Sequence, residues 1–298
     1  MKFKSKIILC VIIALLLLNC QALFLTCAKD KRSLKIDNAE SVFAPITSEY
    51  DFCLRAKFYT TYYASSIERV SNIKRASSSI NDTFLDVNEE FSFNQVVGER
   101  TEKNGYLSAK IISYGKFVEG VGGGVCQVST TLYNAVLLAG LTVTESHPHS
   151  LAVSYIAPSF DAMVSFGYAD LKFVNDTGFP IVIKTEANDY MLTISIFGQK
   201  MSERYARQST ITGELPAPPE ETIFDEENLY PELDMGERKV ICYSKKGLTS
   251  EGLLIKLVDN KPVSIKRIRK DVYRGAKGLI VMKKPANDIT YQTVSGID

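Results

Sequence analysis

Apolar residues recur at helical spacing in two segments of this 298-residue chain. In the first, Ser65-Ser-Ile-Glu68 has the form of a capping box, and apolar positions at Ile67, Val70, Ile73 and Ile80 follow, which predicts a helix over about residues 66–79. In the second, apolar positions three and four residues apart predict a helix over 127–139 that stops at Gly140. Because nearly every face of this second segment is apolar, we expect it to be buried.

Strand-like runs follow the second helix, at 141–145, 151–156, 162–166, 171–174, 181–186 and 191–197. Turn residues at 175–178 and 187–189 separate the last three runs, which are therefore predicted to pair as an antiparallel meander. The pattern predicts an α+β fold in which a helix packs on an antiparallel sheet.

The clearest break lies at Gly213–Glu221, where three prolines and three acidic residues interrupt the apolar pattern and favour an extended linker. Beyond it, alternating residues in 253–258 and 263–268 predict a small all-β module. The predicted organisation is a leader at 1–28, a linker at 29–54, the α+β domain at 55–205, a linker at 206–222, the β module at 223–285 and a tail at 286–298.

The N-terminus has the features of an export signal. Lys2, Lys4 and Lys6 precede the apolar run 7–18, as in a signal peptide. Extended to Ala28, the apolar stretch is long enough for an uncleaved membrane anchor. Either alternative predicts an extracytoplasmic protein, membrane-anchored or secreted.

Charge and cysteine content narrow the range of partners. The formal net charge is +1, which indicates no nucleic-acid partner. Outside the leader the cysteines are Cys53, Cys126 and Cys242, so at least one thiol stays unpaired in an oxidising compartment.

The candidate chemistry centres on Cys126, which follows a glycine run and begins the second predicted helix. A thiol at a helix N-terminus lies in the positive end of the helix dipole, which favours the nucleophilic thiolate. Backbone N–H groups of Gly122, Gly123 and Gly124 are candidate oxyanion donors. The alternative without a catalytic role is that Cys126 is a small apolar core residue.

The two histidines of the chain, His147 and His149, come shortly after the helix and are candidate general bases. We rank His149 first because it adjoins the expected strand 151–156. Asp161 and Asp170 are candidates to orient the imidazole, with turn or strand-end roles as the alternative. Gln127 is a further candidate oxyanion donor. A cysteine at the head of a helix with a later histidine is analogous to papain-like enzymes.

Several motifs together resemble the VanW family. They are Phe91-Ser-Phe-Asn94, Val97-Gly-Glu-Arg-Thr101, Gly105-Tyr106, the segment 121–135 around Cys126, and His147-Pro-His-Ser150. The resemblance runs from about Arg55 to Phe197. It implies cell-wall work, namely L,D-transpeptidation of peptidoglycan stem peptides by the cysteine without a cofactor. Arg100 is a candidate to bind the stem-peptide carboxylate, because a guanidinium offers a planar fork for it, with a solvated surface charge as the alternative. Tyr106, Ser129 and Thr130 are further candidate substrate-binding residues.

The β module resembles the small extracellular module named for its five glycines, with correspondences at Asp225, Leu233, Gly236, Lys246-Gly247, Asn260-Lys261, Asp271 and Tyr273. Three alternatives to transpeptidation stay open. The chain could be a non-catalytic peptidoglycan-binding scaffold associated with glycopeptide resistance, or a cysteine hydrolase of stem peptides. It could also hold zinc through Cys126, His147 and His149, although we predict no metal.

Overall fold

The structure is a computed structural model that describes residues 51–113 and 116–283. The described residues lie in a compact unit that begins at Asp51. The predicted leader at 1–28 and the tail at 286–298 lie outside the described residues. Within the described part, no helix is both long and apolar enough to cross a bilayer.

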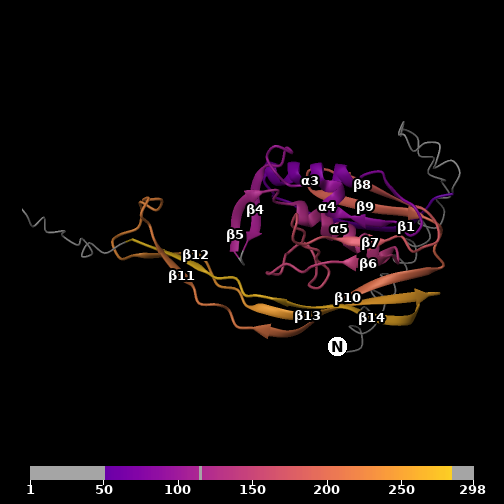
Figure 1. The fold of residues 1–298 in the computed structure, drawn as a ribbon. Helices are drawn as coiled ribbons and strands as arrows, with labels where there is room; N and C mark the ends of the chain where they lie inside the picture. Colours follow the sequence, from indigo (N-terminus) through magenta and orange to yellow (C-terminus); the bar gives the residue numbers. More distant parts are fainter. Residues whose placement is uncertain (1–50, 114–115, 284–298) are drawn as a thin grey trace, which may run out of the picture. The chain divides into compact units, whose positions relative to one another are not determined.

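The N-terminal part of this unit combines three helices with antiparallel strands (Figure 1). The helices are α3 (Ile67–Ile80), α4 (Phe93–Val97) and α5 (Val125–Leu138). One sheet has the order β1-β9-β8-β2, with bounds Cys53–Thr61, Met191–Gly198, Ile181–Ala187 and Thr83–Leu85. A second has the order β3-β7-β6, with bounds Glu90–Ser92, Lys172–Val174 and Thr142–Glu145. Strands β4 (Ser108–Ser113) and β5 (Lys116–Val121) form a hairpin.

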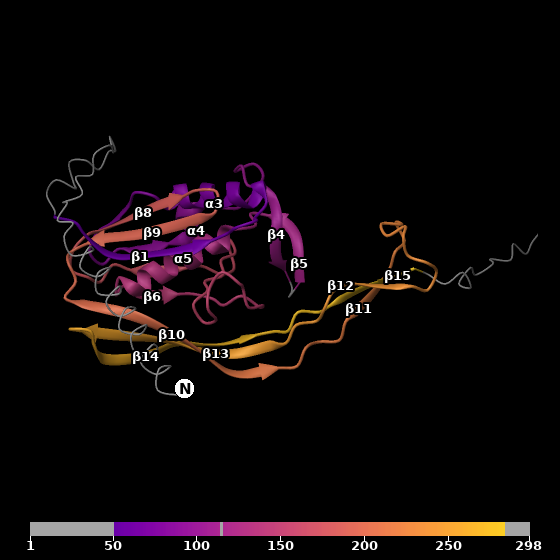
Figure 2. The same cartoon turned by 180° about the vertical axis from the view of Figure 1, so that it is seen from behind.

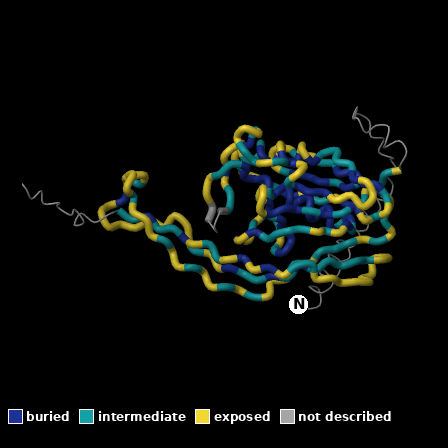
Figure 3. The backbone as a smooth tube through the Cα atoms, viewed as in Figure 1, coloured by how far each residue is buried: buried dark blue, intermediate teal, exposed yellow. Residues whose placement is uncertain are grey.

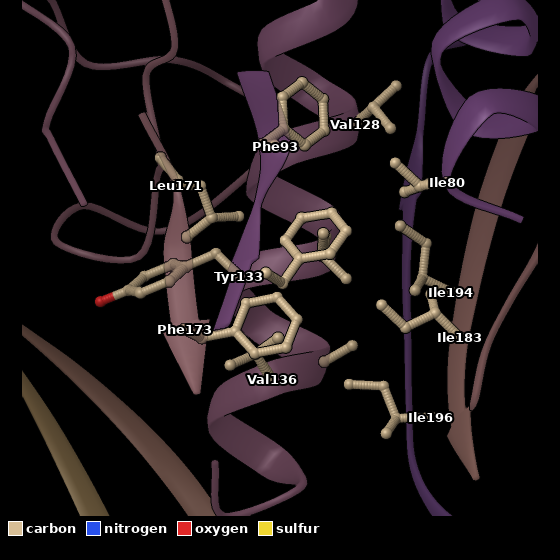
Figure 4. Packing of buried hydrophobic residues seen from close by; sticks show 14 of the residues in the cluster. Ile80, Phe93, Val128, Tyr133, Val136, Leu171, Phe173, Ile183, Ile194 and Ile196 are labelled. Atoms are coloured by element: carbon tan, nitrogen blue, oxygen red, sulfur yellow. The ribbon is translucent and has the colours of Figure 1, made fainter. Parts of the chain in front are cut away.

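Helix α5 is the centre of the core (Figure 4). Its side chains Val128, Tyr133 and Val136 lie among Phe93, Leu171 and Phe173 and the isoleucines of the first sheet. Residues Ile183, Ile194 and Ile196 of that sheet are fully buried. A helix enclosed on all sides needs apolar residues all round, as its sequence has.

The C-terminal part is built from strands (Figure 2). Strands β10 (Glu203–Leu215), β13 (Gly247–Val258) and β14 (Lys261–Tyr273) form an antiparallel sheet in that order. Strands β11 (Glu221–Phe224), β15 (Leu279–Met282) and β12 (Arg238–Cys242) form another. These strands carry far more exposed residues than the helix-containing part does (Figure 3).

Both predicted helices are present, with small corrections to the first. Ser66, rather than Ser65, is the N-cap of α3, because its side chain accepts from the N–H of Arg69. Ile67 is 83% exposed and does not join the apolar face. At the end of α5, Gly140 has a φ of 75° and its N–H donates to the Leu137 carbonyl, as expected for a C-terminal stop.

The predicted strands are correct in part. Strands β6, β7, β8 and β9 match four of the runs, but 151–156 and 162–166 contain no strand, only isolated bridges at Met163 and Ser165. There the backbone bonds to α5 side chains instead: Ser129 Oγ donates to Ala162 O at 2.6 Å, and Ala162 N donates to Thr130 Oγ1 at 3.0 Å. The predicted meander is correct only in its second half: β8 pairs with β9 antiparallel, whereas β7 pairs with β3 and β6 rather than with β8.

The region predicted as a linker at 206–222 is largely strand. Residues 203–215 form β10, which pairs with β13 along most of its length. The break in regular structure falls on the prolines that follow Leu215, since proline cannot donate to a strand ladder.

Candidate active site

Cys126 is the second residue of α5, directly after the glycine turn. Gly124 caps the helix with a φ of 107°, a conformation that side chains rarely adopt. The Cys126 side chain is partly buried, and its Sγ lies 3.4 Å from the carbonyl oxygen of Val164. The turn therefore places the Cys126 thiol at the start of a buried helix, and the Cys126 side chain stays partly accessible.

The glycines have a packing reason of their own. A Cβ on Gly123 would lie 2.8 Å from the backbone of Ala109 and Lys110, and one on Gly124 would lie 2.9 Å from Ile73. The Asn72 side chain also holds this turn by donating to the Gly123 carbonyl at 3.0 Å. The close approach of β4 and α3 thus explains the absence of side chains, independently of any role in binding an oxyanion.

His149 and Asp161 come together beside Cys126. His149 Nδ1 lies 2.7 Å from Asp161 Oδ2, which also accepts from the backbone N–H of His149 at 2.6 Å. Because Nδ1 is engaged by the carboxylate, Nε2 is the ring nitrogen available to the thiol, and the imidazole interacts with Cys126 through hydrogen bonding and charge. Both His149 and Asp161 are buried.

This arrangement shifts the pKa values of Cys126, His149 and Asp161. Burial raises the pKa of the Cys126 thiol, but the hydrogen bond and the charge of His149 outweigh it and leave that pKa below its ordinary value. Burial lowers the pKa of His149, whereas hydrogen bonds to Asp161 and Cys126 raise it, to about 9. Burial likewise raises the pKa of Asp161, yet His149 and the charge of Arg269 bring it below the usual range. The combination favours a thiolate–imidazolium pair.

The second oxygen of Asp161 is held by residues far along the chain. Asp161 Oδ1 accepts from Arg269 Nη2 at 2.7 Å and from the Tyr273 hydroxyl at 2.5 Å. Both residues lie on β14, and nothing in the sequence indicated a contact with Asp161, because they are separated from it by more than 100 residues. They were assigned to a separate β module.

His147 lies apart from the thiol. Its Nε2 lies 3.0 Å from Glu145 Oε1, and its backbone forms a bridge with Met163. Cys126 and the two histidines therefore do not converge as a zinc site requires. Within residues 51–113 and 116–283, no cluster of three or more His, Cys, Asp or Glu side chains has an arrangement that could hold a metal.

Asp170 and Gln127 have other partners than those expected. Asp170 accepts from Ser92 Oγ at 2.6 Å and from the N–H of Asn94 at 2.9 Å, so it holds the start of α4. The Gln127 amide donates to Thr60 Oγ1 at 3.0 Å and also to a carbonyl of β1. Both are buried and hydrogen-bonded within the scaffold, which corrects the expectation that they orient the imidazole and stabilise an oxyanion.

Ser129, Thr130 and Tyr106 are also buried rather than open to a substrate. The hydroxyls of Ser129 and Thr130 hold the backbone of Ala162, next to Asp161. The Tyr106 hydroxyl is buried and finds no hydrogen-bond partner among the described residues. The first two therefore position the Asp161 segment, which corrects their expected contact with substrate.

Two arginines flank the glycine turn. The Arg100 side chain packs over Gly122 and the Arg69 side chain over Gly124, and both interact electrostatically with Cys126. Arg69 Nη2 donates to Gln127 at 2.6 Å, and Arg100 Nη1 donates to the Asn94 side chain at 2.7 Å. Among the described residues neither arginine is ion-paired with a carboxylate side chain.

Tyr155 is a further neighbour of the thiol that the sequence did not indicate. Its side chain shares a hydrogen bond with Thr130 and interacts electrostatically with Cys126 and Arg69. Burial and the Cys126 charge both raise the pKa of Tyr155, which keeps its phenol protonated as a hydrogen-bond donor. Its position in an irregular segment, expected as a strand, concealed this placement.

Known proteins resemble this site region. The family described as VanW like protein matches residues 68–197, which contain Cys126, His149 and Asp161. Residues 68–197 are therefore similar to the VanW family. The uncharacterized protein YoaR of Bacillus subtilis is 44% identical over 140 residues, covering 47% of this chain and 46% of that protein.

A second relative is the vancomycin B-type resistance protein VanW of Enterococcus faecalis, 28% identical over 141 residues, covering 45% of this chain and 51% of that protein. The chain therefore spans about half the length of the curated relatives it matches.

Two solved G5 structures also match. HP0197-G5 has a TM-score of 0.15 at 17% identity, covering 28% of this chain and 99% of its own. The G5 domain of an IgA1 protease has a TM-score of 0.18 at 17% identity, covering 29% and 95%.

Proposed function

We propose that the VanW domain is a cysteine acyltransferase that acts on peptidoglycan stem peptides outside the cytoplasm. The observation that supports this most is the hydrogen-bonded series Cys126–His149–Asp161 at the N-terminus of α5. A nucleophile, a base and a group that orients the base are the parts that covalent acyl transfer requires. The order of a cysteine at a helix start and a later histidine is papain-like, although His149 lies in an irregular segment.

The first half of the reaction forms an acyl-enzyme. The thiolate of Cys126 attacks the carbonyl carbon of the stem-peptide bond, and a C–S bond forms. The His149 imidazolium then gives its proton to the leaving amine as the C–N bond breaks. In the second half, an acceptor amine attacks the thioester carbonyl, loses its proton to His149, and the Cys126 sulfur leaves as thiolate. No cofactor is needed.

Charge on the attacked oxygen needs hydrogen-bond donors. Among the described residues no backbone carbonyl accepts from the N–H of Cys126, whereas Val125 and Gln127 donate to carbonyls of the glycine turn. The Cys126 amide at the helix N-terminus and the protonated Tyr155 phenol are the donors that we assign to the oxyanion.

Charge also indicates the acyl donor. Arg69 and Arg100 offer two guanidinium groups beside the thiol, and neither forms an ion pair with a carboxylate side chain among the described residues. Such groups recognise carboxylates through paired hydrogen bonds. The residue that leaves a stem tetrapeptide carries a terminal carboxylate, and we assign its recognition to these arginines. The relative VanW is named for vancomycin resistance, which agrees with a role in the cell wall.

L,D-transpeptidation and hydrolysis differ only in the acceptor. The test is to incubate the purified protein with a disaccharide tetrapeptide and separate the products. A dimer crosslinked through the third residue supports transpeptidation, and a tripeptide alone supports a hydrolase. If neither product forms with the wild type while the muropeptide still binds, the acyltransferase proposal fails and a wall-binding scaffold replaces it.

A further inference from the structure

The C-terminal strands contact the candidate active site at several points. On β14, residues 269, 271 and 273 alternate with exposed Lys270 and Val272, so the three share the inward face of the strand. Asp271 and Tyr273 are buried, and the Arg269 side chain is 11% exposed. This face meets the segment that carries Asp161.

Two contacts reach Asp161 itself. Arg269 Nη2 and the Tyr273 hydroxyl both donate to its Oδ1, leaving Oδ2 for His149. Arg269 is held in turn by Asp271, which accepts from its Nε at 2.7 Å. The carboxylate is thus bound on one oxygen by β14 and on the other by the imidazole, so its orientation toward His149 depends on both.

Other contacts fix the backbone on either side of the pair. The N–H of Ser159 donates to the Tyr273 hydroxyl at 2.7 Å, and the Ser159 and Ser250 hydroxyls lie 2.7 Å apart. Ser159 has a φ of 67°, a conformation that a non-glycine residue holds only when its surroundings impose it. Near His149, the carbonyl of Ser150 accepts from the N–H of Arg274 at 2.8 Å.

Register explains why β13 shares this role. Ser250 pairs with Asp271 and Gly252 with Arg269, so these β13 residues lie on the same face as the β14 residues. A Cβ on Gly252 would lie 2.9 Å from the Ser159 carbonyl oxygen. Only a residue without a side chain lets the Ser159 segment approach this closely.

We infer that β13 and β14 are part of the catalytic unit, with Arg269 and Tyr273 as positioning residues that hold Asp161 against His149. The inference rests on the proposed role of the Cys126–His149–Asp161 series. The VanW family match ends at residue 197, before either strand. The smallest fully active unit therefore extends through Tyr273 rather than ending with the family domain.

The test measures the rate of Cys126 alkylation by iodoacetamide against pH in the full chain, read by mass spectrometry of the peptide that contains Cys126, because the chain has six cysteines. Cys53 and Cys242 are changed to Ala throughout, so that Cys126 is the one thiol left among the described residues. The variants are Arg269→Met, Arg269→Lys and Tyr273→Phe, and the control is Arg267→Met, an exposed residue of the same strand. The titratable and charged groups around Asp161 are His149, Arg269, Tyr273, Tyr133, Tyr155 and Cys126, with Asp271 behind Arg269.

We expect Arg269→Met and Tyr273→Phe each to move the acid limb of the profile upward by about one pH unit, because a hydrogen bond to a buried charge is lost. On that limb alkylation becomes about tenfold slower. Arg269→Lys should restore part of the loss, and Arg267→Met should match the parent.

Iodoacetamide needs no acyl donor, so this profile reports on the triad even if the wild type transfers no stem peptide. Near-UV circular dichroism checks the fold of each variant. Tyr273→Phe removes a single oxygen and carries the test if Arg269→Met does not fold. Superimposable profiles for the folded variants and the parent, or an equal shift in Arg267→Met, would overturn the inference.

Discussion

At the scale of single residues, the two histidines differ by their partners. His149 lies between Asp161 and Cys126, whereas His147 faces Glu145. The sequence placed both in one short motif and ranked His149 first on the ground of an adjoining strand, which the structure does not contain. The difference between them comes from tertiary contacts that no local pattern encodes.

This difference predicts that only one of two matched substitutions affects the Cys126 thiol. In the wild type, the pKa of the Cys126 thiol lies below its ordinary value, and the pKa of His149 is raised to about 9. His149→Ala removes the cation and leaves burial to raise the thiol pKa. Alkylation of Cys126 at pH 7 should therefore fall at least about tenfold, with the acid limb moving to higher pH.

His147→Ala is the matched control and should leave the alkylation profile in place. The alkylation rate of Cys126 in each variant is measured by quenching the reaction at successive times and quantifying the modified peptide by mass spectrometry. Equal losses in the two variants would mean that the histidine facing the thiol has been wrongly assigned.

At the scale of elements, helices were more predictable than strands. The apolar period of α5 and its glycine stop gave its span within two residues, because a buried helix encodes its own hydrogen bonds. The segment 151–166 has strand-like composition, yet polar side chains of α5 take its backbone hydrogen bonds. A pattern of residue types cannot show which partner a backbone will find.

Helix α3 gives a test of capping at one-residue resolution. Ser66→Ala should lower the free energy of unfolding by about 1 kcal/mol, because the N–H of Arg69 loses its acceptor. Ser65→Ala, one residue earlier, should change it by less than about half that amount. Urea unfolding followed by circular dichroism measures both, and a larger loss for Ser65→Ala would place the cap where the sequence first suggested.

The glycine turn gives a test of close packing. Gly123→Ala puts a methyl group 2.8 Å from the backbone of β4, and rigid backbone cannot yield cheaply. We expect a loss of about 1–3 kcal/mol in unfolding free energy. Gly167→Ala, where a Cβ meets open space, carries only the cost of a left-handed backbone, about 1 kcal/mol. Similar melting temperatures for the two variants would contradict this packing account.

At the scale of the whole molecule, the predicted partition into independent modules differs most from the structure. The sequence divided the chain near the prolines that follow Leu215. The structure instead pairs β10 with β13 and brings β14 to Asp161. Contacts between residues more than 100 positions apart leave no periodic trace in a single sequence, so Arg269 and Tyr273 could not be foreseen.

A remote substitution tests this organisation. Gly252→Ala adds a methyl group that meets the Ser159 carbonyl, and we expect the displaced segment to slow Cys126 alkylation several-fold at pH 7. The neighbouring Glu251→Ala, which loses only partly exposed ion pairs with Arg267 and Lys270, should leave the rate unchanged. Unchanged alkylation in a folded Gly252→Ala protein would argue that β13 is merely a neighbour of the site.

The most direct test of acyl transfer is the intact mass of the protein after brief mixing with a disaccharide tetrapeptide. The account predicts an adduct with the mass of the acyl donor minus the mass of the released terminal amino acid, absent in Cys126→Ala and retained in Cys242→Ala, which removes an exposed thiol. Absence of any adduct from the wild type under conditions in which muropeptide binds, or an adduct that persists in Cys126→Ala, would contradict the assignment of Cys126 as the nucleophile.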